Sequence, residues 1–67
     1  MMNLPKNNSI WKHNKTNQIY RLIVIANTNA DESRKEEYPL TAVYRSDQGQ
    51  VWSRKLDRFL DSFTEIN

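Results

Sequence analysis

Aromatic and guanidinium side chains come together in one short stretch of the sequence, in its C-terminal third. Asp47-Gln48-Gly49 has the composition of a three-residue hairpin loop in which the glycine takes the left-handed backbone conformation. A hairpin closed by this loop pairs Tyr44 with Trp52 and places Arg54 on the same face. Rings and guanidinium planes stack on nucleobases, and guanidinium groups also pair with phosphates. The pattern therefore indicates a surface for an anionic ligand such as a nucleotide.

The same hairpin also has a structural interpretation. A tyrosine paired with a tryptophan across two strands is more often part of a core than of a ligand surface. The pattern therefore favours core positions for Tyr44 and Trp52, with ligand contact as the alternative. Arg54 would then lie at the rim of the fold, with its stem packed and its head in water. Arg45 faces Val51 in this register, whereas a shift of one residue would bring Arg45 beside Trp52.

The candidate ligand-binding residues are those that stacking and phosphate pairing would use: Arg21, Tyr44, Arg45, Trp52 and Arg54. Trp11 has basic or polar neighbours, Lys12 and His13, and it could also stack on a ligand. A tryptophan in the first strand of so small a fold is nevertheless expected to be packed.

Converging catalytic or metal-binding groups are missing from the sequence. His13 is the only histidine, and its neighbours Lys12 and Asn14 carry no carboxylate that would orient its ring as a base. There is no cysteine, no serine lies in a Gly-x-Ser-x-Gly motif, and a single glycine excludes the usual phosphate-binding loops. We therefore predict that the protein is not an enzyme and has no catalytic residue, metal ligand or cofactor.

Length and composition restrict the chain to one small module. A chain of 67 residues, 37% of them hydrophobic and none of them cysteine, excludes a large enclosed active site and a disulfide scaffold. No apolar run approaches the roughly 18 residues of a membrane span, which favours a cytoplasmic location. The net charge is +2, and residues 1–30 contain four basic side chains and no acidic one. This asymmetry is typical of solubilising charge, with attraction of an anionic partner as the alternative.

Period-two and helical patterns along the chain predict a mainly β fold. Residues 1–8 are expected to form a flexible or loosely docked N-terminal arm, and residues 9–67 a single domain. Strands are expected over residues 9–13, 18–27, 38–46, 50–54 and 63–66. The apolar stripe of a short helix precedes the last strand and consists of Leu56, Phe59, Leu60 and Phe63. This order predicts a small SH3-like barrel of about five strands with a short C-terminal helical turn before the last strand.

Two details of the strands carry further expectations. The run over residues 22–26 is apolar on both faces, so its strand is expected to be central in the sheet or strongly bent. Pro39 lacks an N–H donor and suits the first residue of a strand or an exposed edge. The polar connection over residues 28–37 is long for so small a domain, and its residues 31–37 could hold one helical turn.

Several short motifs resemble a widespread and mostly uncharacterised family of very small phage, prophage and bacterial proteins. The motifs are Trp11-Lys12-His13, Asn17-x-x-Tyr20-Arg21, Tyr38-Pro39, Val43-Tyr44-Arg45 and Gly49-x-Val51-Trp52-Ser53-Arg54-x-Leu56-x-x-Phe59. The resemblance covers about residues 10–66 and implies a compact β-barrel with an accessory role in a phage or prophage. The family has proline after the arginine of its Trp-x-Arg-Pro-Leu motif, where this chain has Lys55. That change adds a positive charge beside Arg54.

Three functions agree with these features. The first is a phage-type accessory protein that binds an anionic small ligand at a homo-oligomer interface, with sequestration of a nucleotide signal of host defence as one form of it. The second is a nucleic-acid-binding module that uses the barrel face together with Lys6, Lys12 and Lys15. The third is an adaptor or inhibitor that binds a host protein through an exposed strand edge.

Overall fold

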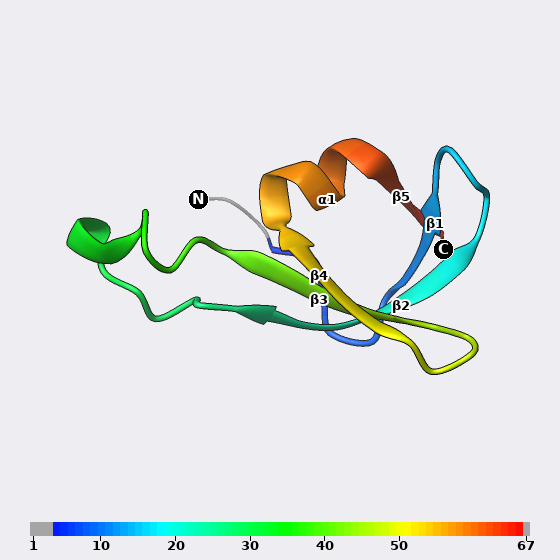
Figure 1. Cartoon of the computed structure of the whole chain (residues 1–67), viewed down its shortest axis with the longest axis horizontal. Coiled ribbons are helices and arrows are strands. Elements are labelled where there is room, and N and C mark those ends of the chain that lie inside the picture. The colour runs from blue at the N-terminus through cyan, green and yellow to red at the C-terminus, as the bar shows by residue number, and fades with distance from the viewer. Residues whose placement is uncertain (1–3, 67) are drawn as a thin grey trace.

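The computed structural model describes residues 4–66, which form one five-stranded antiparallel sheet and one α-helix (Figure 1). In chain order the elements are β1 (Ile10–His13), β2 (Ile19–Ala26), a 3-10 turn (Glu32–Arg34), β3 (Thr41–Ser46), β4 (Val51–Lys55), α1 (Leu56–Ser62) and β5 (Phe63–Ile66). The strand order in the sheet is β4-β3-β2-β1-β5. This is the predicted small SH3-like barrel, with the short helix directly before the last strand.

The barrel is open between β4 and β5, the two edge strands of the sheet. β4 and β5 are the two edges, and α1 connects them across one face of the sheet (Figure 1). We call the face covered by α1 the inner face and the opposite one the outer face. Strand alternation assigns each strand residue to one of them, because residues paired across two strands share a face.

β2 is the central strand, as predicted, and it is also bent by a β-bulge. Its pairing with β3 shifts between Leu22 and Val24, so that Ile23 is the extra residue. The bulge resets the alternation, and Leu22 and Ile25, three residues apart, are therefore both buried in the core. Ile23 and Val24 are exposed instead, a result that a regular apolar strand does not predict.

The β3–β4 hairpin has the predicted register. Tyr44 pairs with Trp52 and Arg45 with Val51. Gly49 has a φ of 86°, and its N–H donates to the carbonyl of Ser46 at 3.0 Å. The left-handed conformation that this loop requires is therefore supplied by the only glycine of the chain.

Asparagine supplies the left-handed conformation at three other turns. Asn8, Asn17 and Asn27 have φ values of 70°, 64° and 71°. Their short polar side chains tolerate this region better than those of other non-glycine residues. Asn17 ends the predicted turn between β1 and β2. The Asn27 side-chain amide donates to the carbonyl of Pro39 at 2.8 Å, which ties together the two ends of the long loop.

The third strand is shorter than predicted. The expected strand over residues 38–46 begins only at Thr41, because Tyr38 and Pro39 still belong to the long loop. Pro39 has no N–H to donate to a sheet, and its carbonyl accepts the Asn27 amide and the Thr41 hydroxyl instead. The predicted helical turn within the loop is present as a 3-10 turn, Glu32–Arg34.

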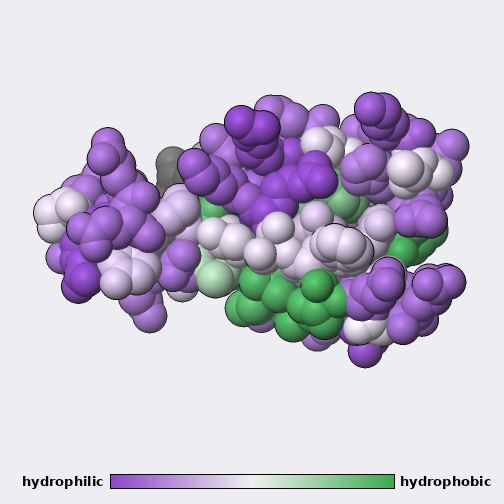
Figure 2. All heavy atoms as spheres, viewed as in Figure 1, coloured by the Kyte–Doolittle hydropathy of each residue, from purple (hydrophilic) through white to green (hydrophobic). Residues whose placement is uncertain are grey.

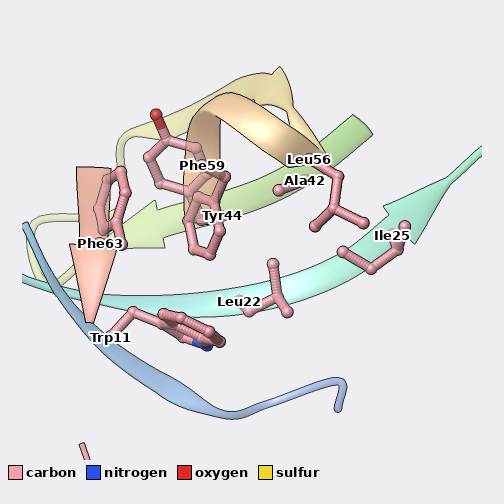
Figure 3. Close-up of a cluster of buried hydrophobic side chains, with 8 residues drawn as sticks. All are labelled: Trp11, Leu22, Ile25, Ala42, Tyr44, Leu56, Phe59 and Phe63. Carbon is pink, nitrogen blue, oxygen red and sulfur yellow. The ribbon is translucent and has the colours of Figure 1, made fainter. Parts of the chain in front are cut away.

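The core lies between α1 and the inner face of the sheet (Figure 3). Its eight buried side chains are Trp11, Leu22, Ile25, Ala42, Tyr44, Leu56, Phe59 and Phe63. Phe59 is fully buried, and its ring lies 5.0 Å from Trp11, 5.2 Å from Tyr44 and 4.3 Å from Phe63 between centroids. The predicted packing of Trp11 is confirmed. Phe59 of α1 thus contacts aromatic rings from β1, β3 and β5, and such ring contacts contribute strongly to the stability of a small core.

The segment before β1 is partly attached to the sheet. Residues 1–3 of the predicted arm, and Asn67, lie outside the described residues. The N–H of Asn8 donates to the carbonyl of Leu22 at 2.7 Å, and the Ser9 hydroxyl donates to the carbonyl of Lys6 at 2.6 Å. These bonds form a turn that leads from the arm onto the centre of β2.

Candidate functional site

The sheet separates the five candidate ligand-binding residues onto two faces. The β3–β4 register places Tyr44, Trp52 and Arg54 on the inner face, where Tyr44 pairs with Trp52 and Arg54 pairs with Ala42. Arg21 and Arg45 pair with each other across β2 and β3 and lie on the outer face. A single small ligand on one copy of the chain therefore cannot contact all five side chains.

The two aromatic candidates differ in exposure although they are paired. Tyr44 is 5% exposed and packs against Tyr20, Phe59 and Phe63, so its ring belongs to the core. Trp52 is 51% exposed, although a core position was expected. The reason is its strand: β4 is an edge of the sheet, so Trp52 has a neighbouring strand on one side only.

Arg54 lies where the barrel is open. Its guanidinium carbon is 5.6 Å from the centroid of the Phe63 ring, a cation–π contact between β4 and the start of β5. The side chain is half-buried, as the rim interpretation predicted.

Arg21 and Arg45 form a pair of like charges on the outer face. Both are exposed and directly opposite each other on neighbouring strands. The Arg21 guanidinium donates to the carbonyl of Asn8 at 3.1 Å, which leaves most of its donors available. Within residues 4–66 the one ion pair joins Lys35 to Glu32, so neither arginine has a carboxylate partner there. Like charges directly opposite each other destabilise a sheet, which makes this pair a local cost to the fold.

Lys12 and Lys55 add to the positive charge of the outer face. Lys12 pairs with Ile19 and is therefore a diagonal neighbour of Arg21, a position about 7–8 Å away between backbones. Lys55 pairs with Thr41 at the other end of β3. Strand alternation could have assigned Lys12 to this face from the sequence, but only the register brings it beside Arg21.

The acidic residues of the described chain lie elsewhere. Within the five strands the one acidic residue is Glu65, which pairs with Trp11 and not with an outer-face residue. The others are in the long loop and its turn, in the β3–β4 hairpin loop and on α1: Asp31, Glu32, Glu36, Glu37, Asp47, Asp57 and Asp61. The long loop extends beyond the end of the sheet, and α1 covers the inner face (Figure 1). The net charge of the chain is only +2, but its charges are unevenly distributed. Every charged strand residue of the outer face is basic.

Aliphatic side chains lie beside these cations. Ile23, Val24 and Val51 are exposed large hydrophobic residues of the outer face, and Val43 pairs with Val24. In the space-filling view the largest hydrophobic area lies below the centre, along the side of the sheet opposite α1 (Figure 2). We call Ile23, Val24 and Val43 the aliphatic patch.

Two pockets of the described residues lie away from the arginine pair and the aliphatic patch. An open, polar hollow of about 360 Å³ is lined by residues of the long loop, and a more apolar groove of about 670 Å³ lies between this loop and α1. Leu4, Leu40 and Leu60 are among the residues that line the groove. Neither of these two pockets is lined by Arg21 or any other of the five candidate residues, and Arg21 and Arg45 are exposed at the surface of the sheet.

His13, which pairs with Phe63 across β1 and β5, is held by contacts with its neighbours. The His13 ring lies 4.8 Å from Phe63, edge to face, and its Nδ1 is hydrogen-bonded to the Thr16 backbone and hydroxyl. Over residues 4–66 there is no group of three or more histidine, cysteine or acidic side chains that could hold a metal ion. In the same residues no helix has the length and apolar character needed to cross a membrane.

No protein-family model, no curated protein and no solved structure matches the chain. The resemblance to a family of small phage and bacterial proteins therefore stays a prediction from the motifs.

Proposed function

We propose that the protein is a non-enzymatic binding module that contacts the phosphate groups of a nucleic acid through its outer sheet face. The observation that carries this proposal is the direct pairing of Arg21 with Arg45 without a carboxylate partner in the described residues. Guanidinium groups bind phosphate oxygens in a bidentate fashion. A phosphate between the two arginines would turn a destabilising repulsion into two attractive contacts.

The shape of the surface supports a nucleic-acid backbone over a free nucleotide. Small ligands are held in concave sites that bury most of their surface, whereas Arg21 and Arg45 are exposed on a sheet face and line neither the hollow nor the groove. Tyr44 is buried, and Trp52 is on the inner face, so neither ring can stack on a base held by the arginine pair. A backbone with regularly spaced phosphates needs no such enclosure. A small anionic ligand at an oligomer interface is kept as the alternative in the test.

Fluorescence anisotropy with labelled single-stranded and double-stranded oligonucleotides tests the proposal. With three phosphate contacts, from Lys12, Arg21 and Arg45, affinity for a duplex should fall about 40-fold between about 50 and 200 mM salt. Arg45→Gln should weaken binding and reduce the slope of log affinity against log salt by about 0.9, because one contact is lost. The same variant should unfold a few degrees higher, because removal of the like-charge pair stabilises the sheet by up to about 1 kcal/mol.

Arg58→Gln is the matched control, since Arg58 is an exposed arginine on α1, which covers the opposite face. It makes the same change in net charge and should leave both the salt slope and the affinity close to those of the wild type. The proposal fails if no oligonucleotide binds at low salt, or if Arg58→Gln weakens binding as much as Arg45→Gln does. Calorimetric titration of nucleoside phosphates in parallel identifies the small-ligand alternative, which predicts heat with a free nucleotide and none with oligonucleotides.

The aliphatic patch favours a second candidate, an adaptor that binds an acidic protein. Exposed apolar residues with a polar rim are typical of protein interfaces, in which arginine is enriched. Ile23, Val24 and Val43 form such an apolar area next to Arg21 and Arg45. The nucleic-acid-binding module and the adaptor would use the same face of the sheet and the same two arginines.

Affinity capture after nuclease treatment separates the two candidates. Val24→Asp should abolish capture of a protein partner, because it places a carboxylate in the centre of the apolar area, whereas Thr28→Asp in the long loop should not. A protein retained by the wild type and by Thr28→Asp, but lost from both Val24→Asp and Arg45→Gln, supports the adaptor. Equal retention by all variants contradicts it.

A further inference from the structure

β4 is an edge strand that displays the two most exposed large hydrophobic residues of the described chain. Val51 is 60% exposed and Trp52 51%. The strand pairs with β3 on one side, and no strand of residues 4–66 pairs with it on the other. Edge strands present unpaired backbone donors and acceptors, and natural proteins usually protect them. A further strand added at this edge would pair its free backbone groups and cover part of the Trp52 side chain.

The sequence of β4 is complementary to itself. In an antiparallel pair of two β4 strands centred on Ser53, Trp52 of each copy faces Arg54 of the other. Val51 faces Lys55 in the same way. Both Trp52 and Arg54 are on the inner face, so their side chains would meet on the same side of the joined sheet. We propose that two copies of the chain form a two-fold symmetric dimer by this pairing of β4 with β4.

A contact that Arg54 makes within one copy supports a second copy of the chain as the partner of β4. Its guanidinium carbon lies over the Phe63 ring, 5.6 Å from the centroid, so this ring occupies one side of the group; the residue is half-buried without an ion pair among the described residues. In the dimer the indole of the second copy's Trp52 would cover the other side, so that the cation lies between two rings. Guanidinium groups favour such stacked positions. The exposed indole and the half-satisfied cation are thus complementary surfaces of the same strand.

Charge selects the register centred on Ser53. A shift that centres the pair on Arg54 would place two arginines directly opposite each other, which is unfavourable. A shift that centres it on Trp52 would place two indoles opposite each other and leave Arg54 facing Gln50. The register centred on Ser53 has no like charges in contact and uses all five residues of β4.

The dimer would join the two outer faces into one continuous surface. The Arg21–Arg45 pairs of the two copies would then lie on the same side, and the two Arg45 positions would be three strand spacings, about 14 Å, apart across the strands and four residues, about 13 Å, apart along them. The dimer does not depend on phosphate binding, because none of its contacts uses Lys12, Arg21 or Arg45. Its test therefore uses no nucleic acid.

Sedimentation of the whole chain over low micromolar to near-millimolar concentrations measures the association. We expect the mass to rise from 8.0 kDa towards twice that value as the concentration increases. Trp52→Thr keeps the strand propensity and removes the indole, and Arg54→Gln keeps a polar side chain and removes the cation. Each should shift the monomer–dimer midpoint at least tenfold to higher concentration. Thermal unfolding of each variant checks that the fold is retained. A wild type that stays monomeric throughout, or folded variants that associate as tightly as the wild type, would overturn the proposal.

Cysteine cross-linking tests the register, and the chain has no cysteine of its own to interfere. Ser53→Cys should form a covalent dimer under mild oxidation, because position 53 faces its own copy at the two-fold axis. Val51→Cys is the matched control on the same exposed face of β4. The two copies of position 51 would be about 13 Å apart along the strands, beyond the reach of a disulfide. Faster cross-linking of Val51→Cys or Trp52→Cys than of Ser53→Cys would refute the proposed register.

Discussion

Phe59→Ala is expected to leave the protein largely unfolded at room temperature. The Phe59 side chain is completely buried and contacts the rings of Trp11, Tyr44 and Phe63. Truncation of a buried phenylalanine costs about 3–5 kcal/mol, and a core of this size supplies a net stability of only about 3–5 kcal/mol. Urea unfolding followed by tryptophan fluorescence should therefore show no native baseline for this variant.

Leu60→Ala is the control for Phe59→Ala because it changes the next residue of the same helix. Leu60 is exposed on the side of α1 that lines the groove, so its truncation should alter the free energy of unfolding by less than about 1 kcal/mol. A cooperative transition for Phe59→Ala with a midpoint as high as that of Leu60→Ala would contradict the assignment of Phe59 to the centre of the core.

The β-bulge in β2 predicts a large difference between two adjacent positions. Ile25→Thr should lower the free energy of unfolding by about 2–3 kcal/mol, because it removes a methyl group from the core and buries a hydroxyl there. Val24→Thr changes an exposed side chain to one of the same shape and should cost less than about 0.5 kcal/mol. Both substitutions keep a β-branched residue, so strand propensity is unchanged. Denaturant unfolding of the two variants measures the difference.

A regular β2 strand would give the opposite result. Without the bulge, Val24 would share the inner face with Leu22, and Ile25 would point outward. A larger loss of stability for Val24→Thr than for Ile25→Thr would therefore show that β2 pairs with β3 without the shift between Leu22 and Val24.

Local signals were sufficient for much of the fold. The hairpin register followed from the three-residue loop ending in Gly49, and the helix followed from the spacing of its apolar residues. The last strand, Phe63–Ile66, had the predicted bounds. These features depend on residues only a few positions apart, so backbone preferences and alternation decide them. The strand before the hairpin was overextended, because hydrogen bonding by the distant Asn27 keeps Pro39 in the loop.

The candidate site depended on distances that local signals do not encode. Arg21 and Arg45 were both chosen as anion-binding candidates, but their direct pairing follows from the long-range register between β2 and β3. Trp52 is exposed whereas its partner Tyr44 is buried, because β4 is an edge of the sheet. Sequence alternation assigns a residue to a face, but it does not say whether a neighbour covers that face.

By itself, the sequence determined the class of fold, the order of its elements and the chemical types available for binding, because these depend on composition and on patterns of a few residues. Only the tertiary structure decided which arginines meet, which ring is buried and which strand edge is left uncovered. The physical reason is that strand pairing and a single bulge determine where each side chain lies, and both arise from contacts between segments far apart in the chain.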